Sequence, residues 1–328
     1  MNSRKKKVAA VLAVFVLAVL FWYLTGNAGK YMIRKSIRMQ DISLFGEENG
    51  TVQVGTKTYR YNKEIIPILC LGIDNWGPVS IQTQGGQADA VYLAAIDPKN
   101  NDIQVIGIPR DTMAEVEVRD VLGNDMGSKQ LQLTLQFAYG TSGEESCDLM
   151  KSAVSKLLYN VPISGYFALN MEAINVFNDA IGGVEVTVPE DLTKFHPDLE
   201  KGRTLVLHGD QAFAFVKMRD HEESRTSYGR MERQKQYMKS FAKKAKKEIA
   251  KNPALLLTML DQLSDYTITD LSVEELIYLA GIGLKSEIEN VEIRLLPGKI
   301  VQGERYEEFY LDEDGVKEVL LDVFYEEI

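Results

Sequence analysis

The sequence LCLGID at residues 69–74, with ADAVYLAAID at 88–97 and IQVIGIPRDT at 103–112, decides the fold of this chain. Each segment contains a short run rich in Val, Ile, Leu or Ala, and each run is bounded by Gly, Pro or Asp. Such runs are typical of strands that are buried on both faces of a sheet. We therefore expect three strands, at residues 67–73, 90–96 and 103–108.

Charged side chains stand where these runs end. Asp74 follows the first run, Asp89 precedes the second, and Arg110 and Asp111 follow the third. Open α/β folds bind their ligands at strand ends, so we expect these side chains to meet at one edge of the sheet. Two carboxylates beside an arginine predict a site for a cation together with an anionic group, most simply a metal-bound phosphate. The alternative is that they are ordinary turn residues at strand ends.

Helical and strand patterns alternate along the rest of the chain. This alternation predicts an α-β-α sandwich with a mostly parallel central sheet. Residues 51–62 alternate around Gly55 and predict a hairpin, whereas residues 114–130 are polar and are expected to be irregular. Further elements are expected as a helix that Ser142 or Gly143 caps, a strand at 165–169, a helix at 171–181, a strand at 184–188, a helix at 273–284 and a strand at 291–296.

The N-terminus reads as a membrane anchor. Residues 1–7 carry four basic side chains, and residues 8–24 form an uncharged apolar run. Such a run is about 26 Å long as a helix, at the short end for a bilayer span. The basic flank stays cytoplasmic, so the C-terminal part would lie outside the cell, with the lipid bilayer as a partner. A cleaved signal peptide is the competing interpretation.

These patterns divide the chain into segments. We expect a cytoplasmic basic tail at 1–7, a transmembrane helix at 8–25, a stem and hairpin at 26–62, a catalytic domain at 63–300 and an acidic helix at 301–328.

Composition excludes several classes of function. The net charge of −10 argues against nucleic acid, because that binding requires an excess of Lys and Arg. Cys70 and Cys147 are too few for a disulfide framework, and the three histidines lack the spacing of metal ligands.

A second set of cations follows in the chain. Lys217 and Arg219 precede a helix that we expect to start near Arg230, with Arg233 and Gln234 in its first turns. Arginine at a helix N-terminus adds positive charge to the positive end of the macrodipole, which costs stability. A bound anion would offset this cost, and the free backbone N–H groups at a helix N-terminus also favour an anion. The alternative is a solvated basic helix. With the carboxylates at the strand ends, these cations predict a site that binds Mg²⁺ and a pyrophosphate and transfers a phosphoryl group.

Several motifs together resemble the LytR-CpsA-Psr family of bacterial cell-envelope proteins. The resemblance covers residues 65–247 and, more weakly, extends to residues 297–298. Its motifs are LGID at 71–74, Asp89, IDPK at 96–99, IPRDT at 108–112, AYG at 138–140, IGGV at 181–184, KMR at 217–219 and RMERQ at 230–234.

The resemblance implies a single-pass anchor, an extracytoplasmic α/β domain and an apolar pocket for a polyprenyl chain. The implied activity is transfer of a glycopolymer, such as teichoic acid or capsule, from undecaprenyl pyrophosphate to peptidoglycan. Asp74 and Asp89 would bind Mg²⁺. The residues that the resemblance implies in pyrophosphate binding are Arg110, Lys217, Arg219, Arg230 and Gln234, and we expect Arg233 to join them. The residues that we expect to be catalytic are Arg110, Asp111, Arg219 and Arg230.

This sequence departs from the family pattern at four positions. Gln87 and Ala88 stand where the family has Arg and Ser, Lys217 replaces an arginine, and Ser227 replaces an aspartate. Each change weakens the ability of the site to bind or stabilise charged groups. Lysine, for example, lacks the planar fork of arginine. A non-catalytic member that binds polyprenyl pyrophosphate or wall polymer is therefore the alternative to an active transferase, and an anchored domain with no ligand is a third hypothesis.

Overall fold

A computed structural model describes residues 26–33, 51–74, 86–171, 173–218, 226–287, 291–304 and 306–328. Within these ranges, no helix has the length and hydropathy needed to cross a bilayer. The membrane helix predicted at residues 8–25 lies outside them. Residues 26–33 are helical, and Ile33 is buried against α7 (Val273–Lys285).

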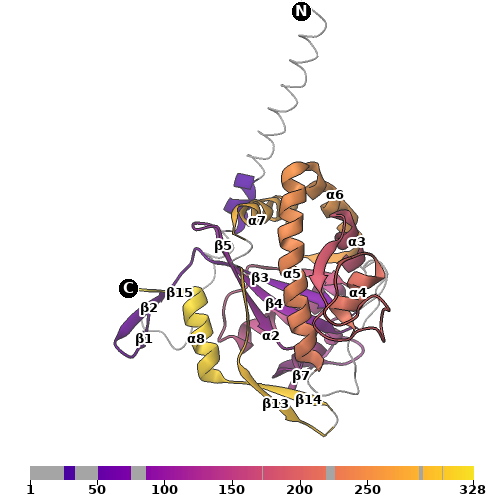
Figure 1. The fold of residues 1–328 in the computed structure, drawn as a ribbon. Helices are drawn as coiled ribbons and strands as arrows, with labels where there is room; N and C mark the ends of the chain where they lie inside the picture. Colours follow the sequence, from indigo (N-terminus) through magenta and orange to yellow (C-terminus); the bar gives the residue numbers. More distant parts are fainter. Residues whose placement is uncertain are drawn as a thin grey trace, which may run out of the picture.

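A six-stranded mixed sheet is the centre of the molecule, in the order β11-β8-β3-β4-β5-β12 (Figure 1). The strands predicted at 67–73, 90–96 and 103–108 are all present. The bounds of the six strands are Thr267–Thr269 for β11, Gly165–Asn170 for β8, Ile66–Ile73 for β3, Ala88–Asp97 for β4, Asp102–Ile108 for β5 and Glu292–Leu295 for β12.

The prediction that this sheet is mostly parallel is wrong. Only the β3–β8 and β5–β12 pairs are parallel, whereas β3–β4, β4–β5 and β8–β11 are antiparallel. β4 ends at Asp97 and β5 begins at Asp102, which is too short a connection for the crossover that parallel neighbours require. A buried strand has the same apolar pattern in either direction, so composition could not reveal the difference.

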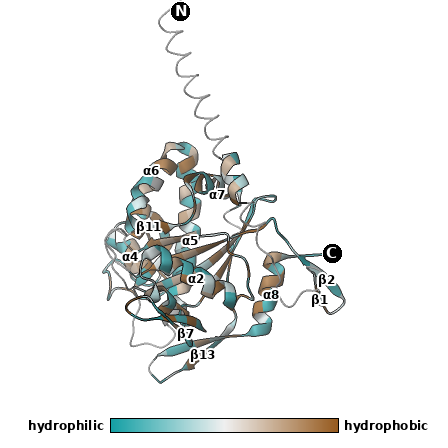
Figure 2. Ribbon diagram, turned by 180° about the vertical axis from the view of Figure 1, so that it is seen from behind, coloured by the Kyte–Doolittle hydropathy of each residue, from teal (hydrophilic) through white to brown (hydrophobic). Residues whose placement is uncertain are grey.

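Helices cover both faces of the sheet, in agreement with the predicted layers. α2 (Gly143–Leu157), the 3₁₀ helix η2 (Leu133–Tyr139) and α8 (Glu313–Phe324) pack on one face, where Leu69 and Leu71 of β3 point. α5 (Thr226–Lys251) and α7 cover the other face (Figures 1 and 2). Ser142 caps α2 as predicted, since its side chain accepts a hydrogen bond from the backbone N–H of Glu145.

A second apolar core lies beside the sheet and holds the elements that lead into α5. It includes residues from each of α3 (Ala173–Ala180), β9 (Val184–Thr187), β10 (Thr204–Leu207), α4 (Asp210–Lys217), α5 and α6 (Ala254–Leu263). The one-turn helix η3 (Ser264–Tyr266) connects α6 to β11. Its buried α5 members are Tyr237 and Ala245, so this core packs beside the middle of α5.

Hairpins outside the central sheet complete the described part of the fold. The predicted one is present as β1 (Thr51–Val54) and β2 (Lys57–Tyr61), with Gly55 in the turn at φ +62°. Residues expected to be irregular form a second hairpin, β6 (Met113–Arg119) and β7 (Asp125–Gln132). Most of β7 is exposed, so it lacks the apolar alternation that marks a strand.

The predicted boundaries at residues 62 and 300 cut through one core. The expected acidic helix at 301–328 is shorter, because β13 (Gly298–Gln302) and β14 (Glu307–Leu311) form a hairpin before α8. After α8, β15 (Tyr325–Glu327) pairs with β2. Tyr61 and Phe324 belong to the same core cluster as the central strands, so both end segments are part of the domain.

Candidate functional site

The end of β3, the start of β4 and the end of β5 meet at one edge of the sheet, as predicted. The antiparallel meander produces this meeting, since alternate strand ends share an edge. Gly72 pairs with Ala90 and Ile73 pairs with Ala88, so Asp89 is an extra residue in β4 and forms a bulge. Bulges re-aim side chains next to functional sites, and this one directs Asp89 towards α5.

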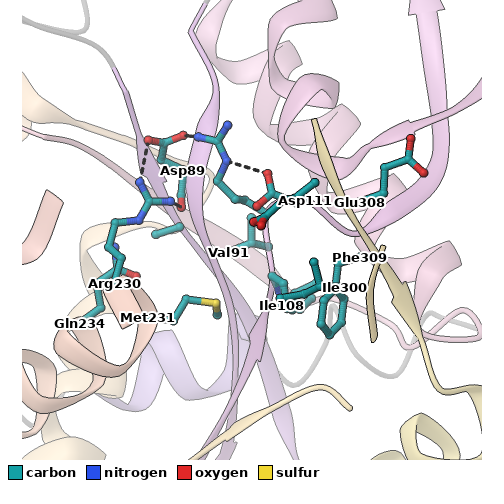
Figure 3. Close-up of a pocket in the computed structure, with 14 residues that line it drawn as sticks. Asp89, Val91, Ile108, Asp111, Arg230, Met231, Gln234, Ile300, Glu308 and Phe309 are labelled. Carbon is teal, nitrogen blue, oxygen red and sulfur yellow. Dashed lines mark hydrogen bonds and ion pairs between the residues drawn. The ribbon is translucent and has the colours of Figure 1, made fainter. Parts of the chain in front are cut away.

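Asp89 is held between two arginines. Arg110 Nη1 donates to Asp89 Oδ1, and Arg230 Nη1 donates to Asp89 Oδ2 at 3.3 Å (Figure 3). Arg230 Nη2 also donates to the backbone carbonyl of Asp89 at 3.2 Å. The exposed fractions of Asp89 and Arg230 are only 6% and 3%, so two guanidinium groups and a carboxylate share a nearly dry volume. Charges in such a place interact more strongly than in water.

Arg110 connects this pair to the loop after β5. Its Nε donates to Asp111 Oδ1 at 3.2 Å, and its Nη2 donates to Gln87 Oε1 at 3.1 Å. Gln132 Nε2 donates to the same Asp111 oxygen at 3.3 Å. Gln87, one of the departures from the family pattern, therefore contacts an arginine of the site, and Ala88 is buried in the core of the opposite face.

Lys217 pairs with the second predicted carboxylate, that of Asp74, which follows β3. It is the last residue of α4, and its Nζ donates to Asp74 Oδ1. The exposed fraction of the Asp74 side chain is 40%, so this ion pair is more solvated than the one at Asp89.

The helix that carries Arg230 begins earlier than predicted. α5 starts at Thr226, so Arg230 lies a full turn inside it, and its backbone N–H is not among the free groups at the helix end. The expectation that an anion meets free backbone N–H groups at Arg230 is therefore wrong. Arg230 acts through its side chain, which is buried over β4.

The Asp89 cluster is the group formed by Asp89, Arg110 and Arg230. Arg233 lies one turn further along α5 and is not part of this cluster. Its Nε donates to the carbonyl of Phe215 at 2.9 Å, its Nη2 donates to the carbonyl of Met218, and its Nη1 pairs with Glu190. Burial lowers the pKa of Arg233 to about 10, so the side chain remains charged at neutral pH. These contacts join α5 to the end of α4.

Gln234 lines the pocket, but both ends of its amide have partners within the fold. Tyr92 donates to Gln234 Oε1 at 2.8 Å, and Gln234 Nε2 donates to the carbonyl of Val216 at 3.3 Å. Burial raises the pKa of Tyr92, so its phenol keeps the proton that it donates. Tyr92 is a positioning residue that the sequence pattern did not identify, because in β4 it reads as an ordinary core aromatic.

Two further positions lie outside what the structure describes. They are Arg219, which the resemblance implies in pyrophosphate binding, and the side chain of Ser227.

Asp74 and Asp89 would need further ligands from a substrate to hold a hard cation such as Mg²⁺. Asp74 and Asp89 offer the oxygen ligands that Mg²⁺ prefers. Among the described residues, however, no group of three or more His, Cys, Asp or Glu side chains could hold a metal ion. Phosphate oxygens would therefore have to complete the coordination, as is common for Mg²⁺ sites.

A pocket opens beside the Asp89 cluster and has two walls. Asp89, Arg110, Arg230 and Gln234 lie along one side, with Asp111 between the two walls. The β13–β14 hairpin supplies the other wall, with Ile300, Glu307, Glu308 and Phe309 (Figure 3). The sequence pattern assigned no chemical role to this segment, although its tyrosines beside adjacent glutamates were a usable signal.

A second cavity, of about 330 Å³, lies further along α5 and is largely apolar. It lies between α5, α7 and the strands β5 and β12. Its lining includes Val105, Met238, Ala242, Ala245, Ile249 and Ile293.

Two guanidinium groups and a buried carboxylate thus meet at one edge of the sheet of this α/β domain, and an apolar cavity lies further along α5. The LytR_cpsA_psr family profile matches residues 30–321. The chain therefore belongs to the LytR_cpsA_psr family.

Individual relatives agree with this assignment. The chain is 34% identical over 191 residues to the polyisoprenyl-teichoic acid–peptidoglycan teichoic acid transferase TagU of Bacillus cereus, covering 58% of this chain and 56% of that protein. The match thus spans little more than half of the relative's length.

Two solved structures share the fold at 22% identity. TagV of B. subtilis gives a TM-score of 0.63, with 80% of this chain and 96% of that chain covered. TagT bound to LIIa-WTA gives 0.61, with 86% and 98% covered.

Proposed function

We propose that the protein is a membrane-anchored extracytoplasmic transferase. It moves a glycopolymer of the teichoic acid or capsule type from a polyprenyl pyrophosphate carrier to peptidoglycan. The family, the teichoic acid transferase activity in the name of the TagU relative and the solved complex of TagT with LIIa-WTA support this proposal. The basic residues 1–7 and the apolar residues 8–25 support the anchor and the location of the C-terminal part outside the cell.

The observation that carries the proposal is that a charged pocket and an apolar cavity follow one another along α5. Arg230 and Gln234 line the charged pocket, and Met238, Ala242 and Ile249 line the apolar cavity. Arg230 and Ile249 are about 28 Å apart along a helix. A polyprenyl pyrophosphate has a charged head and a long apolar tail in the same order, and α5 offers one surface to each.

The arginines of the Asp89 cluster hold the diphosphate. Arg110 and Arg230 present planar forks that match phosphate oxygens, and Lys217 adds a point charge. In the reaction, an acceptor hydroxyl oxygen bonds to the phosphorus that carries the polymer, and the bond from this phosphorus to the bridging oxygen breaks. Polyprenyl phosphate leaves. The cations stabilise the charge that develops on the phosphoryl oxygens, and the Asp111 carboxylate accepts the proton of the hydroxyl.

Mg²⁺ is the proposed cofactor, with Asp74 and Asp89 as its protein ligands. When bound, it would neutralise charge on the diphosphate. In the free protein these carboxylates are paired with Arg110, Arg230 and Lys217. A diphosphate that engages these three cations would release the two carboxylates, which would then hold the metal ion. We therefore expect Mg²⁺ and the diphosphate to bind cooperatively.

The test is a transfer assay with the full chain in detergent. A fluorescent lipid-linked teichoic acid precursor and uncrosslinked peptidoglycan should yield labelled peptidoglycan and polyprenyl phosphate in equal amounts. Asp89→Asn should abolish both products, whereas Asp102→Asn, at the far end of the same sheet, should keep them. Donor binding by the wild type without either product would contradict the proposal and support the non-catalytic alternative.

A further inference from the structure

A third cavity, of about 220 Å³, lies between the helix at residues 26–33 and α7, which are neighbours at one end of the molecule (Figure 1). None of the residues that line it lines the charged pocket or the apolar cavity. The polar side chains in its lining are those of Asn27, Lys30, Tyr278 and Lys285, and no carboxylate is among the described residues that line it. Ammonium, amide and hydroxyl groups together suit an anion.

The two helices that form this cavity touch at Gly29. A Cβ atom at this position would overlap the carbonyl oxygen of Glu274 in α7, so the close approach requires glycine. Ile33, one turn further on, is buried in a core cluster that includes Ile282 of α7. These contacts fix the helix at residues 26–33 on α7, so each wall of the cavity carries one cation, Lys30 or Lys285.

α7 separates this cavity from the apolar cavity beside α5. Ile277, Gly281 and Lys285 line the new cavity at intervals of four residues, so they share one face of the helix. Ala280 and Leu284 line the apolar cavity from another face. A ligand in the new cavity and a chain in the apolar cavity would therefore lie on two faces of one helix.

The new cavity is close in the chain to the proposed membrane anchor. The apolar run ends at Leu24, and Lys30 is six residues further on. Six residues span about 9 Å as a helix and at most about 20 Å when extended. A bilayer about 40–45 Å thick with a hydrocarbon core of about 30 Å leaves about 5–8 Å for each headgroup layer. Lys30, whose side chain adds further reach, is thus placed to meet the phosphates of the leaflet where the anchor ends.

Apolar groups beside the two lysines favour a lipid over a free phosphate ion. Tyr31 is 70% exposed and Met32 is 45% exposed, and both follow Lys30 directly. Tyrosine is enriched at membrane–water interfaces, and apolar side chains next to a cation are typical of a helix at a membrane surface. Ile277 and Ile282 in the cavity lining suit the glycerol and acyl part of a lipid.

We propose that this cavity binds the phosphate of an anionic phospholipid headgroup, with Lys30 and Lys285 as its principal contacts. The inference rests on the proposed function, which supplies the membrane anchor. A lipid bound here fixes the orientation of the domain on the bilayer. Because the apolar cavity lies on another face of the same helix, this orientation also keeps that cavity near the membrane that contains the polyprenyl carrier.

The test measures lipid binding to the full chain in detergent by native mass spectrometry. Dioctanoyl phosphatidylglycerol is the anionic probe, and dioctanoyl phosphatidylcholine is the zwitterionic reference. The variants are Lys30→Gln and the double substitution Lys30→Gln with Lys285→Gln. Lys30 is the more informative position, because Lys285 lies in the last turn of α7, where a cation also stabilises the helix dipole. The matched control is Lys129→Gln with Lys201→Gln, two exposed lysines on β7 and between β9 and β10.

The wild type should bind one phosphatidylglycerol molecule more tightly than phosphatidylcholine. The Kd for phosphatidylglycerol should rise about fivefold in Lys30→Gln and about twentyfold in the double variant, and should not change in the control. Equal Kd values for the two lipids in the wild type, or an equal rise in the control, would overturn the headgroup site. Displacement of the lipid by an equimolar amount of inorganic phosphate or of geranyl pyrophosphate would also overturn it, because the cavity would then take a free phosphate or the donor.

A second readout separates this site from the proposed function. The thermal shift with geranyl pyrophosphate and Mg²⁺ should be unchanged in the double variant, whereas Asp89→Asn should lose this shift and keep the wild-type Kd for phosphatidylglycerol. An intact donor shift without a preference for the anionic lipid would overturn the headgroup site alone. Lipid binding that depends on Lys30, in a wild type that shows neither donor binding nor transfer, would retain the headgroup site and overturn the proposed function instead.

Discussion

Two buried arginines lie one turn apart on α5, and their surroundings give them different roles. Arg230 donates to the carboxylate of Asp89, which lines a pocket. Arg233 donates to backbone carbonyls at the end of α4 and pairs with Glu190. Backbone carbonyls in a packed core cannot be exchanged for a ligand without breaking the fold, whereas in the proposed function the Asp89 carboxylate would exchange an arginine for a metal ion. The comparison shows that the partner of a buried charge, more than its burial, indicates a ligand site.

Arg233→Ala should have the largest effect, on folding. It leaves the carbonyls of Phe215 and Met218 without this donor, at a cost of about 1–3 kcal/mol each, whereas the loss of the cation beside the half-exposed Glu190 adds less than about 1 kcal/mol. Denaturant unfolding measures the loss. Arg60→Ala is the control, because the exposed pair of Arg60 with Glu326 contributes less than about 1 kcal/mol. A variant as stable as the wild type that fails to bind the donor would reverse the roles of the two arginines.

Arg230→Gln should instead affect the reaction. The change removes a charge aimed at the diphosphate, so transfer should fall by about 10²–10³-fold. Unfolding should change by less than in Arg233→Ala, because Arg110 still pairs with Asp89. Lys235→Gln, on the exposed side of the same helix, should transfer at the wild-type rate. Transfer within threefold of wild type in Arg230→Gln would contradict the assigned role.

Lys217→Arg should strengthen phosphate binding at the site to which Arg230 belongs, and so increase the contrast between this site and the structural contacts of Arg233. A guanidinium group binds phosphate through two parallel hydrogen bonds, where lysine offers a point charge. We expect transfer to rise several-fold, by about tenfold at most, in a steady-state assay. Lys235→Arg should leave the rate unchanged. A decrease with Lys217→Arg would mean that this position requires the smaller cation beside Asp74.

Tyr92→Phe should have the smallest effect. It removes the hydrogen bond to Gln234, at a cost of about 1 kcal/mol in the free energy of unfolding. Transfer should fall slightly, because the Gln234 amide loses its fixed orientation. If Tyr92→Phe abolished transfer at unchanged stability, Tyr92 would have to contact the substrate directly.

The sequence predicted the central strands and the meeting of Asp89 with Arg110, because strand-end charges follow from local pattern. The Asp74 side chain pairs with Lys217 of α4. The sequence did not predict the antiparallel direction of β4, since a buried strand reads alike in both directions. The bulge at Asp89 was equally invisible, because it depends on the register against β3.

The role of Arg233 could not be predicted from α5 alone. Its partners lie in segments that are distant in sequence, at Glu190 and at the end of α4. The hairpin wall was missed for a similar reason. β13 and β14 become part of the pocket only through Asp111 and Gln132, which long-range folding brings beside them.

The most direct test of the account is the thermal stability of the full chain in detergent with geranyl pyrophosphate, with and without Mg²⁺, in the wild type and in Asp89→Asn. A ligand at a hundred times its Kd stabilises a protein by about 2.7 kcal/mol, which is a shift of several degrees at this size. We expect a shift in the wild type that requires Mg²⁺ and diphosphate together, and no such shift in Asp89→Asn. A shift that persists in Asp89→Asn would contradict the claim that Asp89 and its two arginines form the site of the diphosphate, and an equal shift without Mg²⁺ would contradict the assignment of Asp74 and Asp89 as metal ligands.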